Sequence, residues 1–139
     1  MIISGVTSLI MNIELFDDAI RKSICPGKSE ITIEQYMKAL SYSVERLGVG
    51  NVSSVLIAGI EPIENTIICA KKLLHIGVIP TIIPFKPYDN CELHNQKTTD
   101  PVILQIINEE ISNEKIKISF PNVDSHSCIG CGACNVIKI

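Results

Sequence analysis

The chain has 139 residues and a formal net charge of −3, with 46% hydrophobic and 19% charged residues. This length allows one domain with a real core, and this composition argues against disorder over most of the chain. The charge balance excludes a broad basic surface for non-specific nucleic-acid binding, and no apolar run approaches the ~18 residues of a membrane span. The first residues also lack a secretory signal, so the sequence predicts a cytoplasmic protein.

The chain opens with a strand pattern followed by a helix pattern. Residues 8–15 (SLIMNIEL) form a short apolar run, which predicts a buried strand. Residues 16–24 predict a short helix, which should end before Pro26 because proline disfavours helical geometry in the preceding residue.

Residues 32–47 give the clearest helical pattern, with an apolar stripe along one face. Thr32 and Gln35 stand in capping-box positions at its start, and Gly48 suits its end. The further predicted elements are a strand at 52–60, a helix at 63–76, a strand at 78–85, a polar loop at 86–99, a helix at 100–114 and a short extended piece within 115–127.

Alternating helices and apolar strands predict an α/β fold, in which helices cover a parallel sheet. Three strand–helix units cannot close an eight-stranded barrel, so we expect a small open sheet or a partial βα-barrel over residues 1–114. Residues 115–139 would form a cysteine-rich C-terminal extension. In either arrangement, ligands should bind at the carboxyl ends of the strands.

Polar residues near the predicted strand ends are the first candidates for a site. Asn12 and Glu14 are two positions apart, so a regular strand would turn both to one face, which should then be polar or bind a ligand. Glu14 could instead lie in the following loop, bonded to a helix N-terminus. Gly59 would allow a close approach to the backbone, and Glu61 stands at a strand–helix junction that could equally be a tight turn.

Two prolines mark the end of the third predicted strand, in the run IPTIIPFKP at residues 79–87. Proline removes a backbone donor, so edge groups in this run could be left for a planar ligand. A rigid loop explains the same residues equally well.

The C-terminal cysteines are the strongest chemical motif. Cys128, Cys131 and Cys134 follow the Cys-x₂-Cys-x₂-Cys spacing of bacterial ferredoxins, although the fourth cysteine of that pattern is absent. The open position could be filled by water, substrate, Cys91, His126 or another chain. An iron–sulfur cluster is favoured, with zinc and no metal as alternatives. Cys69 lies on the apolar stripe of the helix predicted at 63–76, and this position predicts a small core residue.

Taken together, several stretches resemble the C-terminal part of a radical S-adenosylmethionine (SAM) protein of the biotin-synthase-like group. The carriers are GVTSLIMNIELFD (5–17), ICPGK (24–28), VLIAGIEP (55–62) and IPTIIPFKP (79–87), and the resemblance runs from about residue 5 to residue 114. It implies a TIM-barrel-type fold that binds SAM and a [4Fe–4S] cluster. On this resemblance the SAM-binding positions are Asn12 and Glu14 for the ribose, Gly59 and Glu61 in a strand-end motif, and Ile83, Pro84 and Phe85 near the adenine.

The sequence departs from this family in one important respect. The family's radical-generating cluster uses a Cys-x₃-Cys-x₂-Cys loop after the first strand, and that loop is absent here. We therefore expect a partial enzyme, completed by an N-terminal half-barrel partner or by oligomerisation, with an unknown small-molecule substrate. The alternatives are a stand-alone iron–sulfur electron-transfer module, in which the tail holds the function, and a zinc-stapled, non-catalytic α/β interaction protein. No nucleic-acid or membrane partner is expected.

Overall fold

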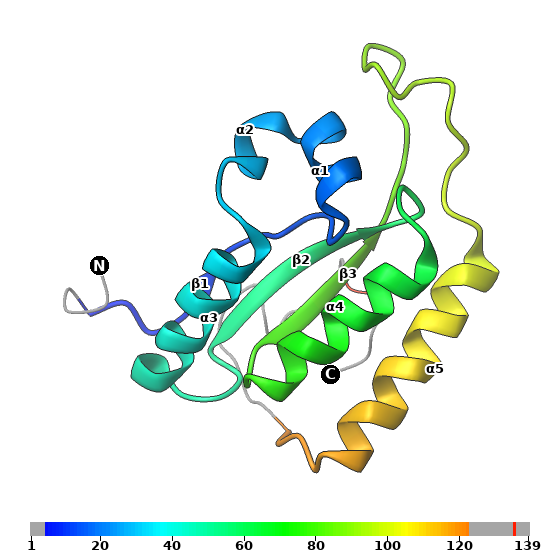
Figure 1. The fold of residues 1–139 in the computed structure, drawn as a ribbon. Helices are drawn as coiled ribbons and strands as arrows, with labels where there is room; N and C mark the ends of the chain where they lie inside the picture. Colours follow the sequence, from blue (N-terminus) through cyan, green and yellow to red (C-terminus); the bar gives the residue numbers. More distant parts are fainter. Residues whose placement is uncertain (1–4, 123–134, 136–139) are drawn as a thin grey trace.

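A computed structural model of the protein describes residues 5–122 and Asn135. The strands are β1 (Leu9–Ile10), β2 (Val52–Ala58) and β3 (Ile79–Pro84). The helices are α1 (Asp18–Ile24), α2 (Pro26–Ser29), α3 (Ile33–Leu47), α4 (Ile63–His75) and α5 (Pro101–Lys117). Helices α3 and α4 pack on one face of the sheet, and α5 packs against α4 (Figure 1).

The three strands lie in the order β1-β2-β3, and both strand pairs are parallel. β2 and β3 pair from Ser53 opposite Ile79 to Ala58 opposite Pro84. Sequential parallel strands with helices on one face are the arrangement of neighbouring units in a βα-barrel, whereas a doubly wound sheet carries helices on both faces. The described residues are therefore a mixed α/β unit with a three-stranded sheet, and they do not close a barrel.

The hydrophobic core lies between the sheet and the helices. Leu56 and Ile82 turn toward the helices and are fully buried, whereas Ile57 and Ile83 belong to the opposite face and are only partly buried. The helices add buried core residues from α3 (Tyr36, Leu40), α4 (Cys69, Ala70, Leu73, Leu74) and α5 (Ile107, Ile111). The opposite face thus keeps apolar side chains outside this core.

Local hydrogen bonds set the helix ends much as the sequence predicts. The Thr32 side chain accepts a hydrogen bond from the Gln35 N–H, and the Gln35 side chain accepts one from the Thr32 N–H, which confirms the capping box. Gly48, directly after α3, has a φ of 90° that favours glycine. Asp100 caps α5 by accepting a hydrogen bond from the Val102 N–H.

The first predicted strand is shorter than expected. Residues 8–15 form a regular strand only at Leu9–Ile10, followed by an isolated bridge between Glu14 and Leu56. From Ile10 to Glu14 the chain advances four residues (14 − 10), while the paired segment of β2 advances three, from Ser53 to Leu56 (56 − 53). One extra residue in a strand is a β-bulge, and it interrupts the ladder.

The short helix α2 is absent from the predicted elements. Pro26, expected only to end the preceding helix, begins α2, because proline suits the first helical position. Helix α5 continues to Lys117, so an extended conformation is wrong for residues 115–117, and residues 118–122 form no strand. Residues 123–127 lie outside the described part. Among the helices of residues 5–122, none is long and apolar enough to cross a lipid bilayer.

Candidate functional site

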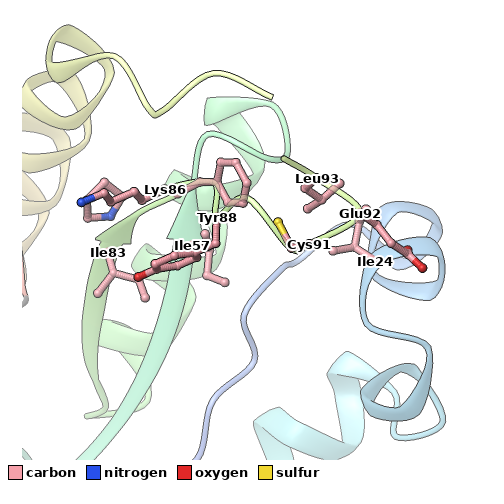
Figure 2. Close-up of a pocket in the computed structure, with 10 residues that line it drawn as sticks. Ile24, Ile57, Ile83, Lys86, Tyr88, Cys91, Glu92 and Leu93 are labelled. Carbon is pink, nitrogen blue, oxygen red and sulfur yellow. The ribbon is translucent and has the colours of Figure 1, made fainter. Parts of the chain in front are cut away.

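A cavity of about 510 Å³ opens at the carboxyl ends of β2 and β3. Ile57 of β2 and Ile83 of β3 line it from the sheet face that is turned away from the core (Figure 2). Ile24 at the end of α1 lines it from the other side, together with Leu93 from the loop after β3. The volume falls within the range of small-molecule sites, which are mostly apolar with a few polar groups.

The loop that follows β3 supplies the polar groups of the cavity. Lys86, Tyr88, Cys91 and Glu92 all line it, and Figure 2 shows them along one continuous segment. Lys86 and Glu92 are exposed and carry opposite charges, so the cavity rim suits a ligand that itself carries both charges. His94 lies nearby, with its Nδ1 2.8 Å from the Cys91 carbonyl oxygen in a local turn.

Thr99 fastens the ends of β2 and β3 to each other. Its hydroxyl donates to the Ala58 carbonyl at 2.6 Å and accepts from the Phe85 N–H at 2.8 Å. Gly59 has a φ of 98°, and a Cβ there would lie 2.4 Å from the Thr99 Oγ1. The close approach to Gly59 that the sequence predicts is made here by the Thr99 side chain.

Glu61 fastens the loop after β1 to the start of α4. Its Oε2 accepts hydrogen bonds from the N–H groups of Phe16 at 2.9 Å and Asp17 at 2.8 Å, and its Oε1 lies 3.4 Å from the Thr66 hydroxyl. Burial raises the pKa of the Glu61 carboxyl, against the lowering effect of the two backbone N–H groups. Both carboxylate oxygens are thus engaged within the protein.

Glu14 and Asn12 occupy different environments. Glu14 has a φ of 69°, and its carboxylate forms an ion pair with the Lys28 ammonium at 2.6 Å. The Asn12 Oδ1 is buried and has no hydrogen-bond partner among the described residues. Such an acceptor is unusual in a folded protein. The prediction that the two side chains share one face assumed regular alternation, which the bulge interrupts.

A buried arginine organises the helices beside the cavity. The Arg21 side chain is fully buried, donates to the carbonyl oxygens of Lys28 at 2.6 Å and Ile31 at 2.8 Å, and lies over the Tyr36 ring. These contacts join α1, the α2 segment and α3. Sequence reasoning missed this role, because the carbonyls that the guanidinium meets belong to a turn that the sequence pattern did not predict.

The described cysteines do not form a metal centre. Cys69 is fully buried in α4, and burial raises the pKa of its thiol to about 12, which confirms the prediction of a core residue. Cys25 and Cys91 are partly buried thiols. Residues 5–122 and Asn135 contain no group of three or more His, Cys, Asp or Glu side chains that could hold a metal ion. The predicted metal ligands Cys128, Cys131 and Cys134 lie outside the described residues.

The cavity brings together one part of the predicted site. Ile83, Pro84 and Phe85 line it, as does Lys86 beside them. Glu14, Gly59 and Glu61 lie near the ends of β1 and β2, where the contacts described above hold the chain in place. Asn12 follows β1, and its buried Oδ1 has no partner among the described residues. Ile57 could have been found from its strand alternation, whereas the polar loop after β3 shows no pattern that predicts which of its residues line a cavity.

No family model matches the chain. The chain is 25% identical over 116 residues to a bacteriochlorophyllide c C-7(1)-hydroxylase of Chlorobaculum limnaeum. The aligned segment covers 82% of this chain and 29% of that relative, so the chain spans less than a third of the relative's length. This distant similarity points toward the radical SAM superfamily without assigning a reaction.

Proposed function

We propose that the cavity binds S-adenosylmethionine and that the chain forms part of a radical SAM-type βα-barrel. The observation that carries the proposal is the position of the cavity, at the carboxyl ends of parallel strands on the face that would turn inward in a barrel. Ile83, Pro84 and Phe85, which the resemblance assigns to the adenine side, line this cavity. The distant similarity to the hydroxylase supports the same superfamily.

The lining fits the chemical parts of this cofactor. Ile57 and Ile83 offer apolar contact to a flat purine ring, and the Lys86 ammonium suits the carboxylate of the methionyl group. The Glu92 carboxylate suits the positively charged ammonium and sulfonium groups. In the superfamily indicated by the resemblance, the bound cofactor supplies a carbon–sulfur bond for reductive cleavage. The role of this chain would be to bind the cofactor, to orient it and to exclude water from its adenosyl end.

The sequence contains no Cys-x₃-Cys-x₂-Cys motif for the cluster that would reduce the cofactor. We propose that a Cys-x₃-Cys-x₂-Cys loop and the first barrel strands come from an N-terminal half-barrel. Cys128, Cys131 and Cys134 are proposed as ligands of a separate metal centre, an iron–sulfur cluster by their ferredoxin-like spacing or a zinc ion. The reaction and its substrate would be determined by both halves together.

Titration of the full chain with SAM tests the cavity directly. Because the cavity forms within this chain, weak saturable binding is expected in isolation, measured by calorimetry up to about 10 mM cofactor. Ile83→Asp places a carboxylate on the apolar wall and should weaken binding by roughly tenfold or more. Ile116→Asp, on an exposed face of α5, is the matched control and should leave it unchanged. No saturable binding by the unmodified chain would overturn the proposal.

The metal centre is tested separately by anaerobic reconstitution with iron and sulfide. About four irons per chain, with the absorption of an iron–sulfur cluster, would support the cluster. Replacing Cys131 with serine should abolish it, whereas Cys69→Ser should retain it because Cys69 is a buried core residue. Stoichiometric zinc or no metal would rule out the iron–sulfur assignment and leave the SAM test unaffected.

A further inference from the structure

The open edge of β3 offers few groups to a neighbouring strand. The Phe85 N–H bonds to the Ala58 carbonyl, so alternation turns the backbone groups of Pro80, Ile82 and Pro84 away from β2. Proline has no N–H group. Within β3, Ile82 therefore carries the N–H that faces this edge.

Asn135 meets the edge at this position. The Ile82 N–H donates to the Asn135 Oδ1 at 2.8 Å, and the Asn135 Nδ2 donates to the Pro80 carbonyl at 3.4 Å. In a further parallel strand, a residue opposite Thr81 would accept from the same N–H and donate to the same carbonyl. The Asn135 carboxamide has an acceptor oxygen and a donor nitrogen. Its side chain therefore makes the two hydrogen bonds that the backbone of a paired strand residue would make.

We propose that the open edge of β3 is the docking site of this chain's own C-terminal tail, with Asn135 as the anchoring residue. The contact joins positions 53 residues apart, so it ties the distal tail to the sheet. Asn135 directly follows the cysteine run in the sequence. The outward edge of β3 carries two prolines and one N–H that is already bonded to Asn135. A further strand would therefore pair at another edge of the sheet.

The docking is independent of cofactor binding and can be tested on the chain alone. Hydrogen exchange of the Ile82 amide, followed by NMR, reports the contact directly because the neighbouring edge residues are prolines without an amide signal. In Asn135→Ala, the Ile82 amide should exchange roughly tenfold faster or more, since it loses its acceptor. The Ile57 amide, which bonds to the Glu14 carbonyl inside the sheet, should keep its rate and report that the fold is intact.

Two further variants sharpen the test. Asn122→Ala makes the same change at an exposed asparagine near the start of the tail and should leave the Ile82 amide protected. Asn135→Asp keeps an acceptor for Ile82 but repels the Pro80 carbonyl, so an intermediate exchange rate is expected.

An unchanged Ile82 exchange rate in Asn135→Ala would overturn the proposal. Protection that persists in this variant and grows with protein concentration would also overturn it, because the occupant of the edge would then be a strand of another copy.

Discussion

The two edges of the sheet differ in what they present to a neighbouring strand. At β1, Leu9 and Met11 turn their N–H groups to β2, so alternation turns those of Ser8 and Ile10 outward, and neither is proline. At β3, two of the three outward positions are proline, and the third bonds to the tail. Within residues 5–122 and Asn135, the β1 edge of the sheet can therefore accept a strand, and the β3 edge is blocked.

This difference bears on where the proposed barrel would be completed. An exposed edge with free N–H groups is a template for strand addition, whereas prolines and capped amides block it. The β1 side also carries the bulge and the buried Oδ1 of Asn12 that lacks a partner within the described chain. We expect the strands supplied by the N-terminal half to pair beside β1.

The chain is also held by side-chain hydrogen bonds after both edge strands, and the two side chains differ in chemistry. The chain after β1 is held by the ionisable carboxylate of Glu61, and the end of β3 is held by the neutral hydroxyl of Thr99. The first fastening should depend on pH, and the second should not.

Disrupting the Thr99 hydrogen bonds at the end of β3 should have the largest effect on stability. Gly59→Ala places a Cβ 2.4 Å from the Thr99 Oγ1 at a φ of 98°, which both strains the backbone and displaces the hydroxyl from its two partners. We expect a loss of about 2–4 kcal/mol in the free energy of unfolding, measured with urea. Gly27→Ala, with open space around its Cβ, is the control and should change little. A loss below about 1 kcal/mol for Gly59→Ala would contradict the close contact.

Disrupting the Glu61 hydrogen bonds after β1 should lower stability somewhat less, by an amount that depends on pH. Glu61→Ala removes the acceptor oxygens of the Phe16 and Asp17 N–H groups and should lower the unfolding free energy by about 1–3 kcal/mol, whereas Glu61→Gln keeps one acceptor oxygen and removes the ionisable proton. Burial raises the pKa of Glu61 above its ordinary value of 4.5, so the folded state binds this proton more tightly than the unfolded state. Its contribution is greatest below the ordinary value and is lost as pH rises through the raised pKa.

The pH signature is checked by urea unfolding at several values between about pH 4.5 and 7. The fall in stability with rising pH that Glu61 causes should disappear in Glu61→Gln. Glu64→Gln, an exposed residue in the first turn of α4, should retain it. Identical pH profiles for the unmodified protein and Glu61→Gln would exclude Glu61 as the source.

A charge placed on the β1 edge tests the comparison without unfolding the protein. Ile10 is 43% exposed on β1, and Ile10→Lys adds the kind of charge that natural edge strands use against unwanted pairing. Sedimentation should show several-fold weaker self-association for this variant. Ile116→Lys removes an even more exposed isoleucine from α5 and should have a smaller effect. An equal effect of both changes would indicate general surface hydrophobicity.

The smallest effect is expected where α5 is held to α4. The His75 ring nitrogen lies 2.8 Å from the Glu114 carboxylate, and this hydrogen bond holds the pKa of Glu114 below its ordinary value of 4.5. The stabilisation is present above that value and is lost as pH falls through the lowered pKa. Thermal melts should show a slightly lower Tm for His75→Ala at neutral pH and no difference in strong acid. Glu34→Gln, in an exposed pair with Lys38, should change Tm less.

Strong local patterns made several elements predictable. The helix at 32–47 and the strand at 52–60 agree with α3 and β2 to within two residues, because apolar periodicity and capping depend on neighbours a few positions apart. The bulge after β1 and the helix beginning at Pro26 were not predictable in this way. Both arise where the chain must fit against β2 and Arg21, which lie outside any local window.

The sequence by itself determined the alternation of strands and helices and the parallel sheet, and it predicted a site at the carboxyl ends of the strands, where the cavity opens. Burial of apolar faces and local capping are enough to specify these features. Only the tertiary structure decided that Glu61 holds the loop after β1, that Thr99 occupies the space beside Gly59, and that Asn135 closes the edge of β3. Each of these contacts joins residues more than 40 positions apart, so it depends on how the whole chain packs.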